Sequence, residues 1–186
     1  AYGLETISDL GISEILKPEY ASLPDNKWLI PTVNLDSFGD GKAKILRLGF
    51  LNRQGKPSSN LIQGDIVQFV CEIESYEDLY DIGIGVMLKD RLNIEIITFN
   101  SYMYNMPLAQ MKKGTKHLAR VEFKVPKLFP QEYTVTVALS DGTQLNHNQQ
   151  HWIHAATTIT IVSKDLVDAC IVTLPQDEVK YYYEQI

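Results

Sequence analysis

The chain has 186 residues and a formal net charge of −6, from 17 Lys and Arg against 23 Asp and Glu. This length favours one domain of ordinary size, and the acidic balance excludes a nucleic-acid-binding domain, because no basic stripe is present to neutralise phosphates. Apolar residues at 45% and charged residues at 22% are close to globular averages and exclude wholesale disorder. Ten residues are Tyr, which is the one unusual count.

Residues 1–35 differ from the rest and are predicted to form a linker or an arm that lies on the main body. The pattern over 7–16 is compatible with a short amphipathic helix that Pro18 ends. Over 23–31, each proline biases the residue before it away from the helix, which predicts an extended connector. No apolar run reaches the ~18–20 residues of a membrane span and no signal peptide is visible, so a soluble cytoplasmic protein is the default expectation.

From residue 41 to 163 apolar residues recur with a period of two, which is typical of β-strands. Arg120, Glu122 and Lys124 alternate with apolar neighbours, which predicts a strand with one face in solvent. The other predicted strands cover residues 43–51, 65–74, 82–88, 94–101, 133–139, 154–162 and 167–174. About eight such strands predict an all-β fold, an antiparallel β-sandwich of immunoglobulin or jelly-roll type. The sandwich domain is placed at 36–175 and a polar, Tyr-rich tail at 176–186.

The sequence contains no motif for catalysis, and neither a catalytic residue nor a cofactor is predicted. Gly41-Lys42 lacks the spacing of a phosphate-binding loop, and Ala43 stands where that motif needs Ser or Thr. No Gly-x-Ser-x-Gly elbow is present. Carboxylates are plentiful, but no pair is singled out for acid–base chemistry.

Three histidines within eight residues, His147, His151 and His154, are the one grouping that resembles a metal site. The first two have the spacing of a helical metal pair, but the residues between them offer neither an acidic base nor a helical pattern. If this segment enters a strand, His151 and His154 point to opposite faces. Histidines that form hydrogen bonds at a loop or strand edge are therefore expected, and no metal site.

Two segments combine aromatic and amide side chains, 100–106 at a strand end and 146–152 between two strands. Aromatic rings offer flat apolar faces to sugar C–H groups, while Asn, Gln and His serve hydroxyl donors and acceptors. The pattern suits a neutral, polyhydroxylated ligand, although Tyr and Trp also pack into sandwich cores and dimer contacts. The candidate ligand-binding residues are Asn100, Tyr102, Tyr104, Trp152 and His154.

The sequence also predicts where several of these and other residues lie in the fold. Tyr102 and Tyr104 are expected to share a strand face, because they are two residues apart. For Trp152 both interpretations stay open: a core or interface residue, or a ligand contact. Cys71 has the apolar phase of a small core residue, and Tyr133 is also expected in the core.

The order of short motifs along the chain resembles a known family. The motifs occupy residues 38–45, 52–57, 61–65, 81–90, 98–102, 127–135 and 152–156. Their succession over 36–175 resembles the C-terminal domain of Wzt-type ATPase subunits, which serve ABC transporters that export O-antigen polysaccharide. The chain departs from the family at Pro130-Gln131-Glu132, where Pro-Gly is common, and at Asn100-Ser101, where Asn-Thr is commoner.

The resemblance implies a non-catalytic β-sandwich that recognises the modified non-reducing end of an O-antigen polysaccharide and commits it to export. It implies a homodimer in which the C-terminal strand, here 166–174, is able to exchange between protomers, and an ATPase half before Ala1. The implied location is the cytoplasmic face of the inner membrane, reached through the transporter's membrane subunit and not by direct insertion. The alternative is a protein–protein interaction or dimerisation module that binds no glycan.

Overall fold

The computed structural model describes residues 26–104 and 109–163. These residues form strands joined by turns, together with one 3₁₀ turn, Asn26–Trp28, and no α-helix. The strands are β1 (Ile30–Pro31), β2 (Ser37–Phe38), β3 (Ala43–Leu51), β4 (Asn60–Ile62), β5 (Ile66–Ser75), β6 (Leu79–Lys89), β7 (Glu95–Asn100), β8 (Ala109–Met111), β9 (Lys116–Lys124), β10 (Glu132–Gly142) and β11 (His147–Val162).

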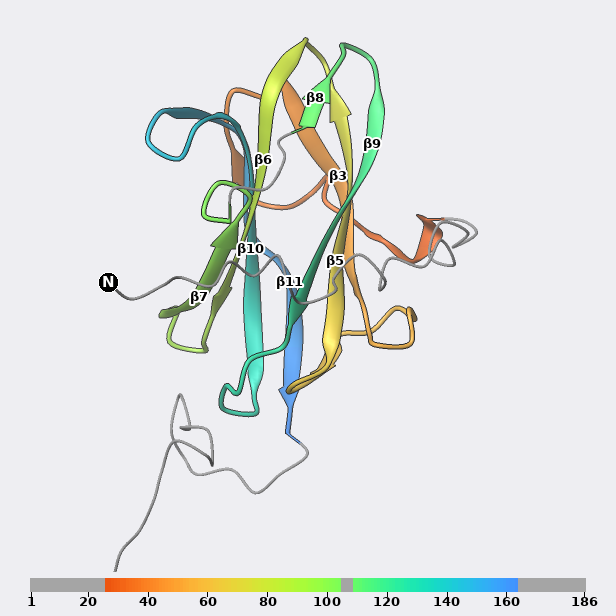
Figure 1. The fold of residues 1–186 in the computed structure, drawn as a ribbon, viewed down its shortest axis with the longest axis vertical. Coiled ribbons are helices and arrows are strands. Elements are labelled where there is room, and N and C mark those ends of the chain that lie inside the picture. Colours follow the sequence, from red (N-terminus) through yellow and green to blue (C-terminus); the bar gives the residue numbers. More distant parts are fainter. Residues whose placement is uncertain (1–25, 105–108, 164–186) are drawn as a thin grey trace, which may run out of the picture.

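Two sheets pack face to face as a sandwich (Figure 1). The four-stranded sheet has the order β1-β3-β5-β9, and the seven-stranded sheet has the order β2-β11-β10-β6-β7, with β4 beside β11 and β8 beside β6. Neighbouring strands in the described part of the chain are antiparallel, apart from the short parallel pairing of β4 with β11. The predicted all-β antiparallel sandwich is confirmed, with several two- or three-residue strands that the sequence pattern had not indicated.

The longer strands lie where the alternation of the sequence predicted them. In β9 the exposed Arg120, Glu122 and Lys124 alternate with half-buried Val121 and Phe123, as expected. The last described strand begins earlier than predicted, at His147 and not at 154, so the segment 146–152 is mostly strand and not a connecting loop. The predicted strand at 167–174, the helix at 7–16 and the tail at 176–186 lie outside the described residues.

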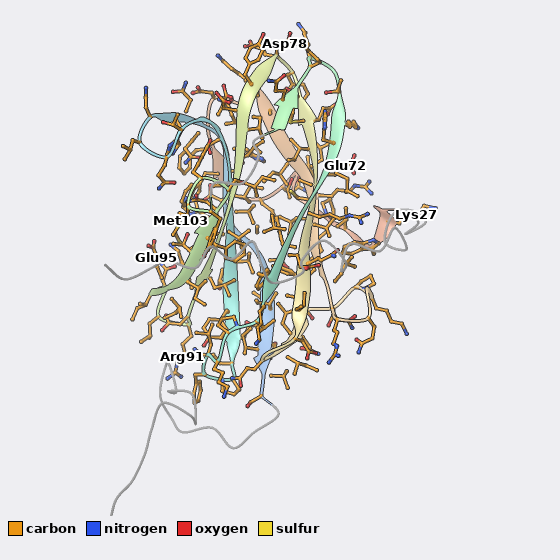
Figure 2. The ribbon with its side chains drawn as sticks, in the orientation of Figure 1. Lys27, Glu72, Asp78, Arg91, Glu95 and Met103 are labelled. Carbon is orange, nitrogen blue, oxygen red and sulfur yellow. The ribbon has the colours of Figure 1, made fainter. Side chains whose placement is uncertain are left out.

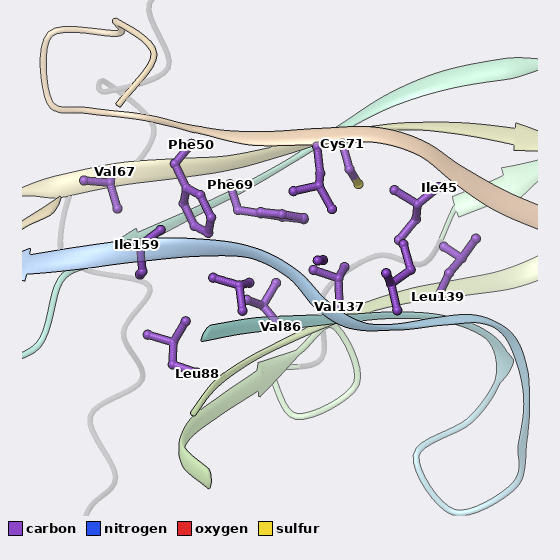
Figure 3. Packing of buried hydrophobic residues seen from close by; sticks show 14 of the residues in the cluster. Ile45, Phe50, Val67, Phe69, Cys71, Val86, Leu88, Val137, Leu139 and Ile159 are labelled. Carbon is purple, nitrogen blue, oxygen red and sulfur yellow. The ribbon is translucent and has the colours of Figure 1, made fainter. Parts of the chain in front are cut away.

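The hydrophobic core fills the space between the two sheets, as Figure 3 shows. Phe50 and Phe69 reach it from the four-stranded sheet, and Val137 reaches it from the seven-stranded sheet. The prediction that Tyr133 is a core residue is confirmed, and its hydroxyl donates to the carbonyl of Phe129 at 2.8 Å. Figure 2 shows the charged residues Asp78 and Arg91 at opposite ends of the sandwich.

Cys71 is fully buried in this core, as predicted. Burial raises the pKa of its thiol to about 12. Because the thiolate is the reactive form, this cysteine is an inert apolar residue at neutral pH.

The segment before β1 lies on the outer face of the four-stranded sheet. Trp28 and Leu29 pack against Leu51 and Val70, which form a small apolar cluster separate from the main core. Gly49 makes this contact possible, because a Cβ at this position would stand 2.6 Å from the Trp28 ring. This outer face is therefore partly covered by the chain itself, whereas the outer face of the seven-stranded sheet carries the candidate site described below.

His151 links the two sheets through a buried hydrogen bond. Its Nδ1 accepts the backbone N–H of Ile45 on β3 at 3.0 Å, next to the bulge between Ile45 and Arg47. Burial lowers the pKa of His151, and the nearby Lys44 lowers it further. The ring is therefore neutral at pH 7, which its role as an acceptor requires.

This arrangement predicts a specific loss of stability in mild acid. The unfolded histidine, with a pKa of about 6.5, takes up a proton that the folded ring excludes, so stability should fall as the pH drops from about 7 to about 5. We expect the melting temperature of His151→Asn, which keeps an acceptor but does not titrate, to depend less on pH over this range. The exposed His117→Asn variant should keep the wild-type slope. An unchanged slope in His151→Asn would contradict the assignment.

Candidate functional site

A cross-strand row on the outer face of the seven-stranded sheet forms the floor of the candidate site. The strand registers place Phe38, Trp152, Ala138, Gly85 and Asn100 side by side on β2, β11, β10, β6 and β7. Ala138 and Gly85, on the central strands, have a side chain of one carbon or none, whereas the larger Trp152 and Asn100 lie on either side of them. The sheet is therefore hollowed over its central strands, and this depression is the groove.

Tyr102 forms one wall of the groove by folding over the glycine next to the floor. A Cβ at Gly83 would stand 2.5 Å from the Tyr102 ring, so only glycine permits this approach. The Tyr102 hydroxyl donates to the carbonyl of Asp81 and contacts Ser140 Oγ, each at 3.1 Å. Its ring lies nearly parallel to the imidazole of His147, with centroids 5.9 Å apart. Burial is the main cause that raises the pKa of Tyr102, so the phenol is neutral at pH 7.

The groove encloses a cavity of about 200 Å³. In the part of the chain that the structure describes, no Lys, Arg, Asp or Glu lines it. The lining residues are Gly85, Val86, Met87, Thr98, Asn100, Tyr102, Thr136, Ala138, Ser140, Gln144, His147, Gln149 and Trp152.

Two of the amides in the lining, Asn100 and Gln149, have hydrogen-bonding groups that are left unpaired in the described part of the chain. Asn100 uses its Oδ1 to accept the backbone N–H of Met103 at 2.9 Å, and its amide nitrogen has no partner among the described residues. The side-chain oxygen of Gln149 is buried, also without a partner within the described ranges. A buried acceptor left unpaired costs about 1–3 kcal/mol. A ligand that donates a hydrogen bond to it would recover that energy.

Three aromatic rings border the groove on the β11 side. Phe38 and Trp152 lie nearly parallel, with centroids 5.9 Å apart and an interplanar angle of 24°. His154 lies 5.8 Å from Phe38 and 6.1 Å from Trp152. The indole N–H of Trp152 donates to His154 Nδ1 at 3.4 Å, which ties the two rings together. These three residues form the aromatic platform.

The structure brings together four of the five residues that the sequence singled out. Asn100, Tyr102 and Trp152 line the cavity, and His154 lies in the aromatic platform beside Trp152. Tyr104 does not join them, because it is 63% exposed and outside the lining. The expectation that Tyr102 and Tyr104 share a strand face is wrong, because β7 ends at Asn100 and residues 101–104 form a turn.

Sequence reasoning missed several residues of the site. Gly83 and Gly85 alternate with apolar residues in one strand, and two glycines on a solvent face would have signalled a hollowed surface. Phe38 gives no such signal, because it lies in a two-residue strand whose partner is more than a hundred positions away. The expectation that His151 and His154 face opposite sides is confirmed, since His151 is buried in the sandwich and His154 is exposed.

No group of three His, Cys, Asp or Glu side chains among the described residues could hold a metal ion. Within the same residues no helix is long and apolar enough to cross a bilayer. The groups that the candidate site offers to a ligand are neutral polar side chains and aromatic rings.

Comparison with known proteins identifies the family. The family model described as the Wzt C-terminal domain matches residues 34–172. The chain belongs to the Wzt C-terminal domain family. This domain is a non-catalytic module, and the family is associated with O-antigen binding in ABC export.

One solved structure shares the fold of this chain. The crystal structure of the C-terminal domain of wzt superimposes with a TM-score of 0.71, covers 80% of this chain and 90% of its own, and is 15% identical. A Niemann-Pick type C2 protein from Japanese carpenter ant has a TM-score of 0.46 and 11% identity, over 69% of this chain and 98% of its own. No curated protein matches the chain. In this chain the groove lies on the seven-stranded sheet of that fold.

The wall of the groove can be tested by removing one hydroxyl. Tyr102→Phe should lower the free energy of unfolding by about 0.5–1.5 kcal/mol, because it removes the hydrogen bonds to Asp81 and Ser140. Tyr104→Phe is the matched control, since its exposed hydroxyl has no partner among the described residues, and should leave stability unchanged. Urea titrations measure both. Equal effects of the two substitutions would contradict the geometry of the wall.

Proposed function

We propose that this domain binds the modified non-reducing end of an O-antigen polysaccharide in the groove, without catalysis, and so selects finished chains for ABC export. One observation carries the proposal: a Wzt C-terminal domain presents an uncharged cavity between Tyr102 and Trp152, with amide groups at its sides. Aromatic faces suit the C–H groups of a sugar ring, and amides can serve both the donors and the acceptors of its hydroxyls.

The charges around the groove favour a neutral glycan end. Lys89 lies on β6 beyond the cavity lining and is paired with Glu95 at 3.4 Å. Arg120 lies on β9, which belongs to the other sheet. Neither side chain belongs to the lining, so a phosphate or an acidic sugar in the cavity would meet no full positive charge among the lining residues.

Membership of the family supports an extension of the proposal to the wider assembly. The domain would act as a homodimer, joined to the transporter's membrane subunit through the full-length protein, at the cytoplasmic face of the inner membrane. The edge of β9 supports pairing with a further strand, because β9 ends the four-stranded sheet in the described part of the chain. The segment 166–174, proposed as the exchanged strand, lies outside the described residues.

A second candidate function is a protein-interaction or dimerisation module that binds no glycan. The exposed ring of Phe38 in the aromatic platform is the observation that favours it, because exposed aromatic residues also mark protein interfaces. Light scattering on the purified chain, combined with a glycan array, separates the two. A dimer with no glycan signal would favour the interaction module.

Filling the floor of the groove should weaken binding without harming the fold. A Cβ at Gly85 would make only ordinary contacts, 3.5 Å from Asn100 Cβ and 3.7 Å from Ala138 Cβ. Gly85→Val therefore places its methyl groups in the cavity while suiting a β-strand better than glycine does. We expect a melting temperature at or above that of the wild type and at least a tenfold loss of affinity, about 1.4 kcal/mol, for the O-polysaccharide of the strain that encodes the chain.

Thr134→Val is the matched control for this substitution, because Thr134 lies on the same face of β10 but outside the lining. It should bind as the wild type does. Calorimetric titration measures both variants. Wild-type affinity in a folded Gly85→Val variant would exclude the groove as the binding site.

The neutral character of the site predicts a weak effect of salt on binding. Between roughly 0.1 M and 1 M salt the Debye length falls from about 10 Å to about 3 Å, so charge–charge attraction is largely screened. We expect the affinity for the polysaccharide to change less than about twofold over this range. A steep loss with salt would show that the glycan end is anionic and is bound by basic residues outside the cavity.

A further inference from the structure

The aromatic platform extends the binding surface past the edge of the groove. Trp152 belongs to both, because it lines the cavity and also packs against Phe38. We propose that Phe38 forms a second stacking subsite, which holds the sugar residue next to the terminal one. This inference rests on the proposed function of the groove and adds that the domain reads at least two consecutive sugar residues.

Phe38 is held in place before any ligand arrives. Three backbone hydrogen bonds fix the segment 36–41 along β11: His154 N–H to the Asp36 carbonyl (3.0 Å), Asp40 N–H to the Gln149 carbonyl (2.8 Å) and Gly41 N–H to the Gln150 carbonyl (3.0 Å). At Gly39, φ is 140° and a Cβ would stand 2.4 Å from the Gln150 carbonyl oxygen, so only glycine allows this close approach. A rigid ring loses little freedom when a ligand stacks on it, which favours binding.

Phe38 is 54% exposed. It belongs to neither of the two hydrophobic clusters that the described residues form. Its place in the row puts it on the side of Trp152 away from Ala138. An aromatic ring kept in solvent by a fixed backbone forgoes the stabilisation that burial would give. Such a ring is suited to a ligand with an apolar face.

The spacing of the strands fits two consecutive sugars better than one. From β10, which carries the floor residue Ala138, to β2, which carries Phe38, is two strand spacings, or about 9–10 Å. A ring seated over Ala138 and beside Trp152 therefore leaves Phe38 to the next residue of the glycan. His154 adds a polar group there, since its Nε2 has no partner in the described part of the chain.

Saturation-transfer NMR tests this subsite, because it reports which sugar residues contact the protein. The probe is the tetrasaccharide from the non-reducing end of the O-polysaccharide made by the strain that encodes the chain. With the wild-type chain, protons of the terminal and the second residue should both receive saturation. With Phe38→Ala, the terminal residue should keep its signal, the second residue should lose it, and affinity should fall about three- to tenfold.

Two further variants serve as controls. Phe38→Tyr keeps the flat ring and should bind as the wild type does, and Phe38→Leu replaces Phe38→Ala if the alanine variant does not fold. Tyr80→Ala removes another exposed aromatic ring, outside the lining, and should change nothing. Saturation of the terminal residue alone in the wild type, or loss of both signals or neither in Phe38→Ala, would overturn the second subsite while the groove stands. Absence of any transfer to the wild type would reject the proposed function itself.

Discussion

The register of β10 between β11 and β6 is the constraint on which the candidate site depends. It aligns Trp152, Ala138 and Gly85 across three strands and points all three away from the core. A slip of one residue would turn Val137 or Leu139 outward and bury the floor of the groove. The core prevents that slip, because Val137 and Leu139 are fully buried between the sheets. The packing of the sandwich therefore also fixes the shape of its outer face.

The groove itself works against local stability. Glycine inside a strand is less favourable than a residue with a side chain, by about 0.5–1 kcal/mol relative to Ala. β6 nevertheless carries two glycines on its outer face: Gly83 admits the Tyr102 ring, and Gly85 leaves the centre of the groove open. The strand can carry both because its inner face supplies Ile82, Val86 and Leu88 to the core. The inner face of β6 thus stabilises the fold, and its outer face shapes the groove.

The fold could be predicted from the sequence because its signal is local. Alternation in 116–124 and 132–142 reveals one buried and one wet face without any knowledge of the partner strands. The start of β11 was missed because Asn148, Gln149 and Gln150 are all polar and show no alternation, and the strand there is imposed by pairing with β10.

The candidate site was predicted only in part. Aromatic and amide residue types indicated Asn100, Tyr102, Trp152 and His154. The rule that residues two positions apart share a strand face did not hold for Tyr104, because a turn capped by Asn100 replaces the strand there.

The proposed function requires that glycan contacts the outer face of the seven-stranded sheet. The most direct measurement is a two-dimensional amide NMR titration of the ¹⁵N-labelled chain with the terminal oligosaccharide of its O-polysaccharide. If glycan binds in the groove, we expect shifts concentrated at Gly83, Gly85, Asn100, Ala138 and Trp152, with no change at Glu72 or Arg120 on the opposite sheet. Shifts gathered on the four-stranded sheet, or none at saturating oligosaccharide, would contradict it.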